Sequence, residues 1–134
     1  MNAVDLALPR LKNEEGFRAT KYTDTQGHTT IGYGFNVDAG ISQYAATALL
    51  NAQAAERHNA LLTYSWYSGL DPVRQSVCLD IAFNGGLHGL LEFPHMIAAL
   101  SRQDWASAAA ECKVTNPELA DRYEKLAQLL LTGA

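Results

Sequence analysis

The chain has 134 residues, of which 48% are hydrophobic and 18% charged, so it fits one globular domain rather than a disordered, collagen-like or coiled-coil protein. Its formal net charge of -4 argues against nucleic acid as a partner, because the long-range field would repel phosphate backbones. The N-terminus lacks a basic start and no apolar run is long enough to span a bilayer, so we expect neither a secretory signal nor stable membrane insertion.

The first element is predicted to be a helix from Leu8 to Glu15. Pro9 lies either at its first turn or at a kink within a longer helix, and these two readings stay open. Gly16 is a natural C-terminal stop, because glycine adopts the backbone angles that end a helix. The helix is therefore expected to end at Glu15, the second of two adjacent glutamates.

A small antiparallel hairpin is predicted over about residues 16–36. β-Branched and aromatic residues favour strands in this segment, and Thr25-Gln26-Gly27 is typical of a hairpin turn. Gly32 and Gly34 alternate with Tyr33 and Phe35, which indicates that the backbone bends there or approaches another group closely. This segment forms the β part of the expected α+β fold.

The rest of the chain, about residues 42–134, is predicted to be helical. Polar capping residues, two of them followed by proline, mark the helix starts. The predicted helices cover residues 42 to about 62, 71 to 85, 94 to about 102, 104 to 112, and 116 to 132. We therefore expect a single domain over residues 1–134, with a small hairpin lobe and a larger helical lobe.

Two carboxyl groups in different environments suggest glycosidic bond hydrolysis, which needs a carboxylic acid on one face of the bond and a carboxylate on the other. Glu15 is the candidate acid, because the negative end of its helix dipole is expected to raise its pKa. Asp24, near the hairpin turn, is expected to stay ionised and act as base or electrostatic stabiliser. Thr30 is expected across the hairpin from Asp24, where its hydroxyl could hold the attacking water.

The order of Glu15-Gly16, Asp24 and Thr30-Ile31-Gly32-Tyr33-Gly34 resembles the signature of phage-type lysozymes. Glu14 is the alternative acid, but only Glu15 keeps this spacing and precedes the glycine. The resemblance implies a muramidase of the endolysin type that cleaves the β-1,4 bond between N-acetylmuramic acid and N-acetylglucosamine with inversion. Inverting enzymes hold their carboxyl groups roughly 6.5–9.5 Å apart, and we predict this spacing for the catalytic pair.

The resemblance continues beyond the hairpin. It implies a lysozyme-like fold in which a long helix, here residues 42–62, bridges the two lobes and the substrate lies in the cleft between them. Phe83 and Asn84 resemble the cleft-lining end of a helix, although core packing and a helix terminus explain these residue types equally well. Arg122 resembles the arginine that faces and tunes the catalytic glutamate. The expected substrate contacts are Gly34, Phe35, Phe83, Asn84 and His28.

Neither a cofactor nor a metal is expected, because the four histidines share no ligand spacing. Cys78 and Cys112 lie in apolar helical stretches and are expected to be reduced core residues. The expected partner is the glycan strands of peptidoglycan, bound by a monomer. An endolysin would collect in the bacterial host cytoplasm and depend on a holin to reach the wall.

Three alternatives stay open at the level of sequence. A phage-tail or secretion-spike component would use the same chemistry with another route of delivery. A non-catalytic peptidoglycan-binding or structural module of such a spike could keep the fold, but a degraded catalytic set would then be expected. A lytic transglycosylase needs the glutamate alone, and the presence of Asp24 and Thr30 argues against it.

Overall fold

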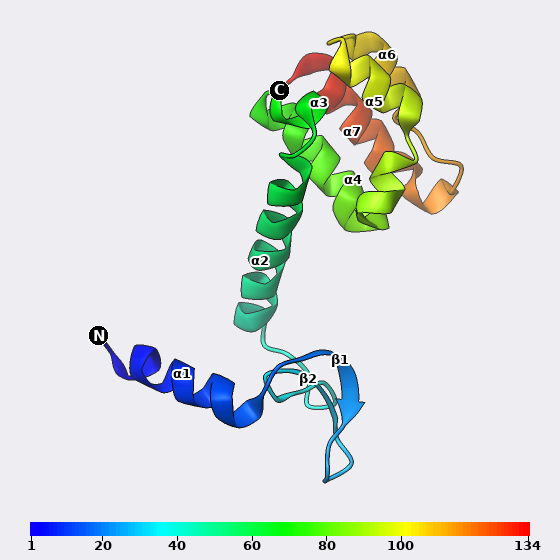
Figure 1. Ribbon diagram of the computed structural model, residues 1–134. Helices are drawn as coiled ribbons and strands as arrows, with labels where there is room; N and C mark the ends of the chain where they lie inside the picture. Colours follow the sequence, from blue (N-terminus) through cyan, green and yellow to red (C-terminus); the bar gives the residue numbers. More distant parts are fainter. The chain divides into compact units, whose positions relative to one another are not determined.

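A computed structural model describes all residues from Met1 to Ala134 and divides the chain into two compact units, Met1–Ala48 and Leu49–Ala134 (Figure 1). The N-terminal unit holds helix α1 (Ala3–Glu15) and a small sheet, and the C-terminal unit is helical. Helix α2 (Gln43–Leu61) begins in the first unit and ends in the second. The α+β class predicted from the sequence is confirmed, while the expectation of one domain stays a prediction.

Helix α1 begins earlier than predicted because Asn2 and Asp5 form a reciprocal cap. The Asp5 backbone N–H donates to the Asn2 side chain at 3.0 Å, and the Asn2 backbone N–H donates to the Asp5 carboxylate at 3.1 Å. Pro9 lies inside this longer helix, which settles the two readings of its position. The helix ends as predicted, because Gly16 adopts a φ of 67° and its N–H donates to the Lys12 carbonyl at 3.0 Å.

The sheet has three antiparallel strands in the order β1 (Arg18–Thr23), β2 (Thr29–Gly32) and β3 (Phe35–Asn36). The predicted turn at residues 25–27 joins β1 to β2, with the Gly27 N–H donating to the Asp24 carbonyl at 3.1 Å. A second turn at Tyr33-Gly34, where the alternating glycines predicted a bend or a close approach, lets β3 pair with β2 through Thr30 with Asn36 and Ile31 with Phe35. The predicted hairpin is thus extended to a three-stranded meander.

The C-terminal unit is a bundle of helices that buries Leu61, the last residue of α2, in its core (Figure 1). Its other helices are α3 (Ser65–Ser68), α4 (Pro72–Leu91), α5 (Pro94–Ser101), α6 (Trp105–Glu111), the 3-10 helix η1 (Pro117–Leu119) and α7 (Ala120–Thr132). The predicted caps are confirmed, since the side chains of Ser42, Asp71, Asp104 and Asn116 each accept a backbone N–H two or three residues later. None of the helices has the length and apolar character that crossing a membrane requires.

Helix α4 corrects one predicted boundary. It was expected to stop at Gly85 and Gly86, but it runs on to Leu91. Gly86 interrupts the helical backbone with φ 77° and ψ 170°, so α4 consists of two helical segments joined by a kink. The two glycines therefore predicted a real interruption of the helix, but the chain resumes the helical conformation directly after Gly86.

The hydrophobic core belongs to the C-terminal unit, because every buried hydrophobic residue lies between Leu61 and Leu130. Its largest fully buried side chains include Tyr67, Leu61, Ile81, Leu90, Met96, Leu100 and Leu130. Cys78 and Cys112 are free and buried in this core. Burial raises the pKa of Cys78 to about 12 and that of Cys112 to about 11, so both stay neutral thiols, as expected of reduced core residues.

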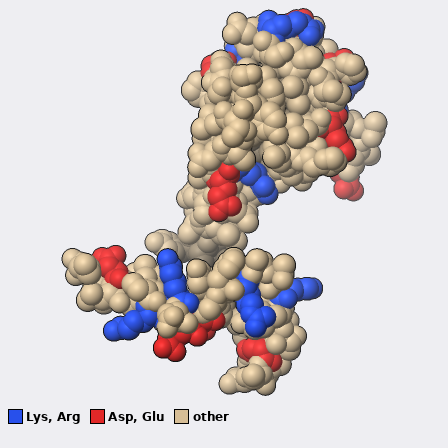
Figure 2. All heavy atoms as spheres, viewed as in Figure 1, with Lys and Arg blue, Asp and Glu red and all other residues tan.

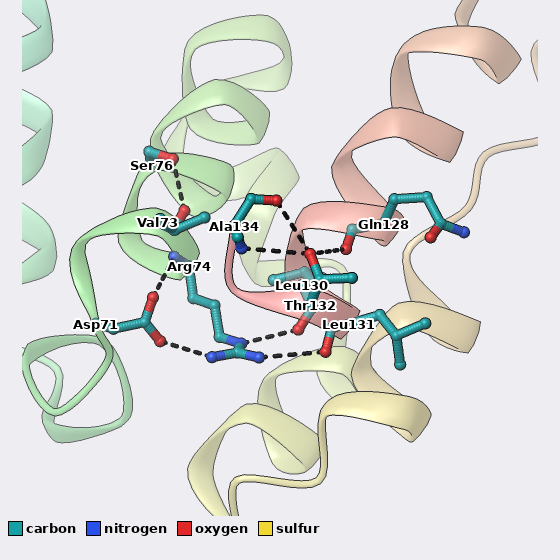
Figure 3. Close-up of polar contacts among 9 residues, drawn as sticks. All are labelled: Asp71, Val73, Arg74, Ser76, Gln128, Leu130, Leu131, Thr132 and Ala134. Atoms are coloured by element: carbon teal, nitrogen blue, oxygen red, sulfur yellow. Dashed lines mark hydrogen bonds and ion pairs between the residues drawn. The ribbon is translucent and has the colours of Figure 1, made fainter.

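Arg74 is the one charged residue buried in this core, at 8% exposed. Its Nε donates to the Leu130 carbonyl at 2.8 Å and its Nη2 to the Leu131 carbonyl at 3.3 Å, while its Nη1 donates to the Asp71 carboxylate at 2.8 Å (Figure 3). The guanidinium carbon lies 3.8 Å from the centre of the Trp105 ring. Because the last carbonyls of a helix lack partners within it, Arg74 ties the end of α7 to the start of α4.

Candidate active site

The Glu15 carboxylate lies against the backbone of Gly34 in the turn between β2 and β3. Gly34 has a φ of 75°, and a Cβ at this position would overlap Glu15 Oε2 and fall 3.0 Å from Glu15 Cδ. Gly32, the last residue of β2, leaves room for the Phe35 ring. The close approach predicted from the alternating glycines is confirmed, and at Gly34 the approaching group is the candidate acid.

Gly34→Ala is expected to lower the rate of glycan hydrolysis by at least about tenfold, because the new methyl group displaces the Glu15 carboxylate and strains the turn. The matched control is Gly27→Ala, which has the same backbone strain at φ 84° but no atom within 4 Å of the added Cβ. Rates should be compared after circular dichroism shows both variants folded. Equal losses in the two variants would mean that turn strain, rather than contact with Glu15, explains the effect.

Asp24 follows β1 directly and forms part of the hairpin turn. Its Oδ1 accepts the backbone N–H of His28 at 2.8 Å and that of Gln26 at 2.9 Å. The bond from His28, together with that from Gln26, outweighs the desolvation that acts the other way and holds the pKa of Asp24 below the 3.8 of an ordinary aspartate. Asp24 is thus both a turn former and an ionised carboxylate of fixed direction, with Oδ2 3.7 Å from His28 Nδ1.

Thr30 is the only buried residue of the N-terminal unit, at 4% exposed. The register pairs it with Tyr22, so it lies diagonally from Asp24 rather than directly across the hairpin. Paired residues share a face of the sheet, which places Thr30 and Tyr22 on one face, whereas Asp24 lies beyond the end of β1 and turns its Oδ1 toward the backbone N–H groups of the turn. The Thr30 hydroxyl donates to the His28 carbonyl at 3.2 Å, so only its lone pairs are left for another partner.

Two aromatic side chains of this unit were missed by the sequence reasoning. Tyr22 pairs with Thr30 and shares its face of the sheet, and the guanidinium carbon of Arg18 lies 4.6 Å from the Tyr22 ring centre. Tyr33 packs against Phe17 with ring centres 5.6 Å apart. The hairpin register would have identified Tyr22, because it lies directly opposite Thr30 and paired residues share a face.

The remaining candidates of the N-terminal unit are accessible. The Phe35 side chain is 64% exposed, and that of His28 is 47% exposed beside Asp24. Gly34 presents its backbone in the turn against which the Glu15 carboxylate lies. The structure thus brings five predicted site residues of this unit into the same small sheet and its turns, next to the end of α1.

Phe83, Asn84 and Arg122 belong to the C-terminal unit and have partners within it. Asn84 Oδ1 accepts the Tyr123 hydroxyl at 3.1 Å. Arg122 forms an ion pair with Asp80 in which its Nε donates to Oδ1 at 2.8 Å. Phe83 is 39% exposed, so it is not a buried core residue. Substrate contact by Phe83 and Asn84, and tuning of the acid by Arg122, stay predictions.

No group of three or more His, Cys, Asp or Glu residues is arranged to hold a metal ion. On the face drawn in Figure 2, the C-terminal unit is mostly uncharged, with basic and acidic side chains at its margins. A cavity of about 480 Å³ lies among residues 92–96 and 111–119, and another of about 280 Å³ lies between α2 and α4. Neither cavity is lined by Glu15, Asp24 or Thr30.

Comparison with known proteins agrees with these features. The family model described as phage lysozyme matches residues 12–127, which include all the predicted site residues. A protein named Probable T4-type lysozyme 1, from Dictyostelium discoideum, is 22% identical over 92% of this chain and 92% of its own length. The pre-baseplate central spike protein Gp5 of Enterobacteria phage T4 is 23% identical over 92% of this chain, but the match covers only 27% of that protein.

Proposed function

The chain belongs to the phage lysozyme family, and from this premise we propose that it is a muramidase that hydrolyses the β-1,4 bond between N-acetylmuramic acid and N-acetylglucosamine in bacterial peptidoglycan. The observation that carries the proposal is the pair of carboxyl groups in the N-terminal unit. Glu15 is held against the Gly34 turn, and the pKa of Asp24 is lowered by backbone N–H groups. These are the acid and the ionised carboxylate that the reaction needs.

In the proposed reaction Glu15 donates its proton to the glycosidic oxygen as the bond to the anomeric carbon breaks. A water attacks that carbon from the opposite face and gives a proton to Asp24. Because the Thr30 hydroxyl already donates to the His28 carbonyl, it can only accept from this water. A water that donates to both Thr30 and Asp24 turns a lone pair toward the sugar, and its attack inverts the anomeric configuration.

Substrate recognition is proposed to be local rather than driven by net charge, because the chain and its polyanionic substrate carry charge of the same sign. Phe35 offers an exposed ring for stacking on a sugar, and His28 and the Gly34 backbone offer polar contacts. Phe83 and Asn84 are proposed as further sugar contacts, with Arg122 tuning the acid. The proposed activity requires neither cofactor nor metal.

The proposed setting is bacteriolysis by a monomer. As an endolysin the protein would accumulate in the bacterial host cytoplasm and act on the wall after a holin opens the membrane. The similarity to a protein named as a phage central spike is compatible with delivery by a tail or secretion spike instead. A non-catalytic module of such a spike is the alternative function, and the intact set of Glu15, Asp24 and Thr30 disfavours it.

The proposal is tested by adding the protein to outer-membrane-permeabilised Gram-negative cells and following turbidity, with mass spectrometry of the released fragments. A muramidase clears the suspension and releases fragments with ordinary reducing ends. Fragments with an anhydro sugar would identify a transglycosylase instead. If the folded protein clears nothing and releases no fragments, the non-catalytic module becomes the better explanation.

The pH dependence of hydrolysis follows from the environment of Asp24. Since backbone N–H groups stabilise its charged form, its pKa lies below 3.8 and the base stays ionised throughout the range from pH 5 to 8. Protonation of Asp24 should therefore reduce kcat/KM only as the pH falls below about 4. The check is a pH profile of wild type and Asp24→Asn with circular dichroism at each pH. An acid limb between pH 5 and 7 that disappears in Asp24→Asn would contradict this assignment.

A further inference from the structure

An irregularity in β1 brings the end of α1 to the turn between β2 and β3. β1 pairs with β2 through Tyr22 with Thr30 and again through Arg18 with Gly32, so three residues of β1 stand opposite one residue of β2. Without this bulge, the register of the first pair would set Arg18 opposite Gly34. The bulge therefore draws the residues before Arg18 alongside the turn, and bulges next to active sites commonly redirect a side chain in this way.

The Glu15 carboxylate reaches this turn with little support of its own. It lies against the backbone of Gly34. No ion pair within the N-terminal unit holds the carboxylate, and no backbone hydrogen bond outside the sheet joins residues 15–17 to the turn. Because an exposed glutamate has several accessible rotamers, the position of this carboxylate depends on how firmly the two segments are held together.

One side-chain contact joins the same two segments. Phe17, two residues after Glu15, packs against Tyr33, the residue before Gly34, with ring centres 5.6 Å apart and ring planes inclined by 48°. Both rings stay partly exposed, at 65% and 37%, in a unit that has no buried hydrophobic residue. An aromatic pair contributes more than the area it buries, so it can hold two short segments together where no core does.

An exposed aromatic ring can also stack on a sugar, and this is the role proposed for Phe35. Phe35 packs against no other aromatic ring of the unit, whereas Phe17 and Tyr33 pack against each other. The ring–ring contact therefore favours a role for Phe17 and Tyr33 within the protein rather than on the substrate.

We propose that Phe17 and Tyr33 are positioning residues that hold the Glu15 carboxylate against the Gly34 turn. The inference rests on the proposed function, because it assigns the aromatic pair to the acid of that muramidase. Neither ring contacts the reacting atoms, and the pair acts by joining the end of α1 to the turn. Loss of either ring leaves the acid present but mobile, which slows the chemical step more than it weakens substrate binding.

Phe17→Ala and Tyr33→Ala are each expected to lower kcat for glycan hydrolysis by about tenfold with KM little changed, once circular dichroism shows the variants folded. The double variant should lose little more than either single variant, because both changes remove the same contact. Phe17→Tyr and Tyr33→Phe keep an aromatic pair and should retain nearly full kcat. Tyr44→Ala is the matched control, because it removes an aromatic ring that is 88% exposed in the same unit.

Two kinetic outcomes would overturn the proposal while leaving the muramidase intact. An unchanged kcat with a raised KM would indicate that the two rings stack on sugar. Losses in the double variant that equal the product of the two single losses would indicate that Phe17 and Tyr33 act independently.

A second readout does not depend on hydrolysis. The backbone amide of Gly34 reports the approach of Glu15 in NMR spectra, so Glu15→Gln should shift its resonance. In Phe17→Ala this response to Glu15→Gln should fall by at least about half, and that result supports the positioning role even if the wild type cleaves no glycan and the proposed function fails. An equal response in both backgrounds, or none in either, would overturn the proposal.

Discussion

Glu15→Gln is expected to lower the rate of peptidoglycan hydrolysis by about a thousandfold without loss of the fold. Glutamine has the shape of glutamic acid but cannot donate the proton that the leaving oxygen requires, and general acid catalysis contributes about 10²–10⁴-fold. Glu15 is exposed at the end of α1, so the change buries no new polar group. The measurement is the initial rate of release of reducing ends, with circular dichroism as the test of folding.

Glu14→Gln provides the matched control, because it makes the same chemical change one residue earlier on the same helix. Glu15 is the glutamate whose carboxylate reaches the Gly34 turn, so Glu14→Gln should keep nearly full activity. The assignment would be wrong if Glu14→Gln were inactive while folded Glu15→Gln kept its activity. Equal and small losses in both variants would indicate that neither glutamate is the acid.

The features that could be predicted from the sequence are those set by local chemistry. Asp71 before Pro72 and Asn116 before Pro117 predicted helix starts, since capping and the fixed φ of proline act within one turn of the chain. The end of α1 at Glu15 followed from Gly16 in the same way. Because Asp24 lies in the turn, its environment was also predictable from nearby residues: the donors that lower its pKa are two and four residues away.

The features that could not be predicted depend on contacts between distant segments. The two-residue strand β3 carries no pattern of its own and exists because it pairs with β2. Gly34 was identified as a place of close approach, but only the fold shows that Glu15, 19 positions earlier, is what approaches. The contact between Arg57 and the Phe83 ring has no motif, because it depends on how α2 and α4 lie relative to each other.

The structural role of Arg74 could not be predicted either, since a single arginine in a helix is usually a solvated charge. The structure shows Arg74 buried and bonded to the carbonyls of Leu130 and Leu131, which are 56 and 57 positions later in the sequence. No pattern near Arg74 indicates the carbonyls of Leu130 and Leu131 as its acceptors. Its contribution to stability can be predicted only now that these partners are known.

Arg74→Met is expected to lower the free energy of unfolding by about 3 kcal/mol, or roughly 10 °C in Tm. Methionine keeps most of the apolar volume but leaves two carbonyls at the end of α7 without donors, that of the buried Leu130 and that of Leu131. The loss of the Asp71 partner adds less, because that side chain is 37% exposed and solvent screens it. Urea unfolding followed by circular dichroism measures the difference.

Arg102→Met is the control, because its ion pair with Asp104 is exposed and should be worth less than about 1 kcal/mol.

The pH dependence of the free energy of unfolding separates the contribution of Asp71 from that of the carbonyls. Burial raises the pKa of Asp71, but the bonds from Arg74 outweigh it and leave the pKa lowered, so this part of the stability is present above pH 3.8 and is lost as the pH falls through the lowered value. The difference in the free energy of unfolding between wild type and Arg74→Met should therefore become smaller in acid without disappearing. If this difference disappears in acid, the ion pair with Asp71, and not the hydrogen bonds to the end of α7, accounts for the contribution of Arg74 to stability.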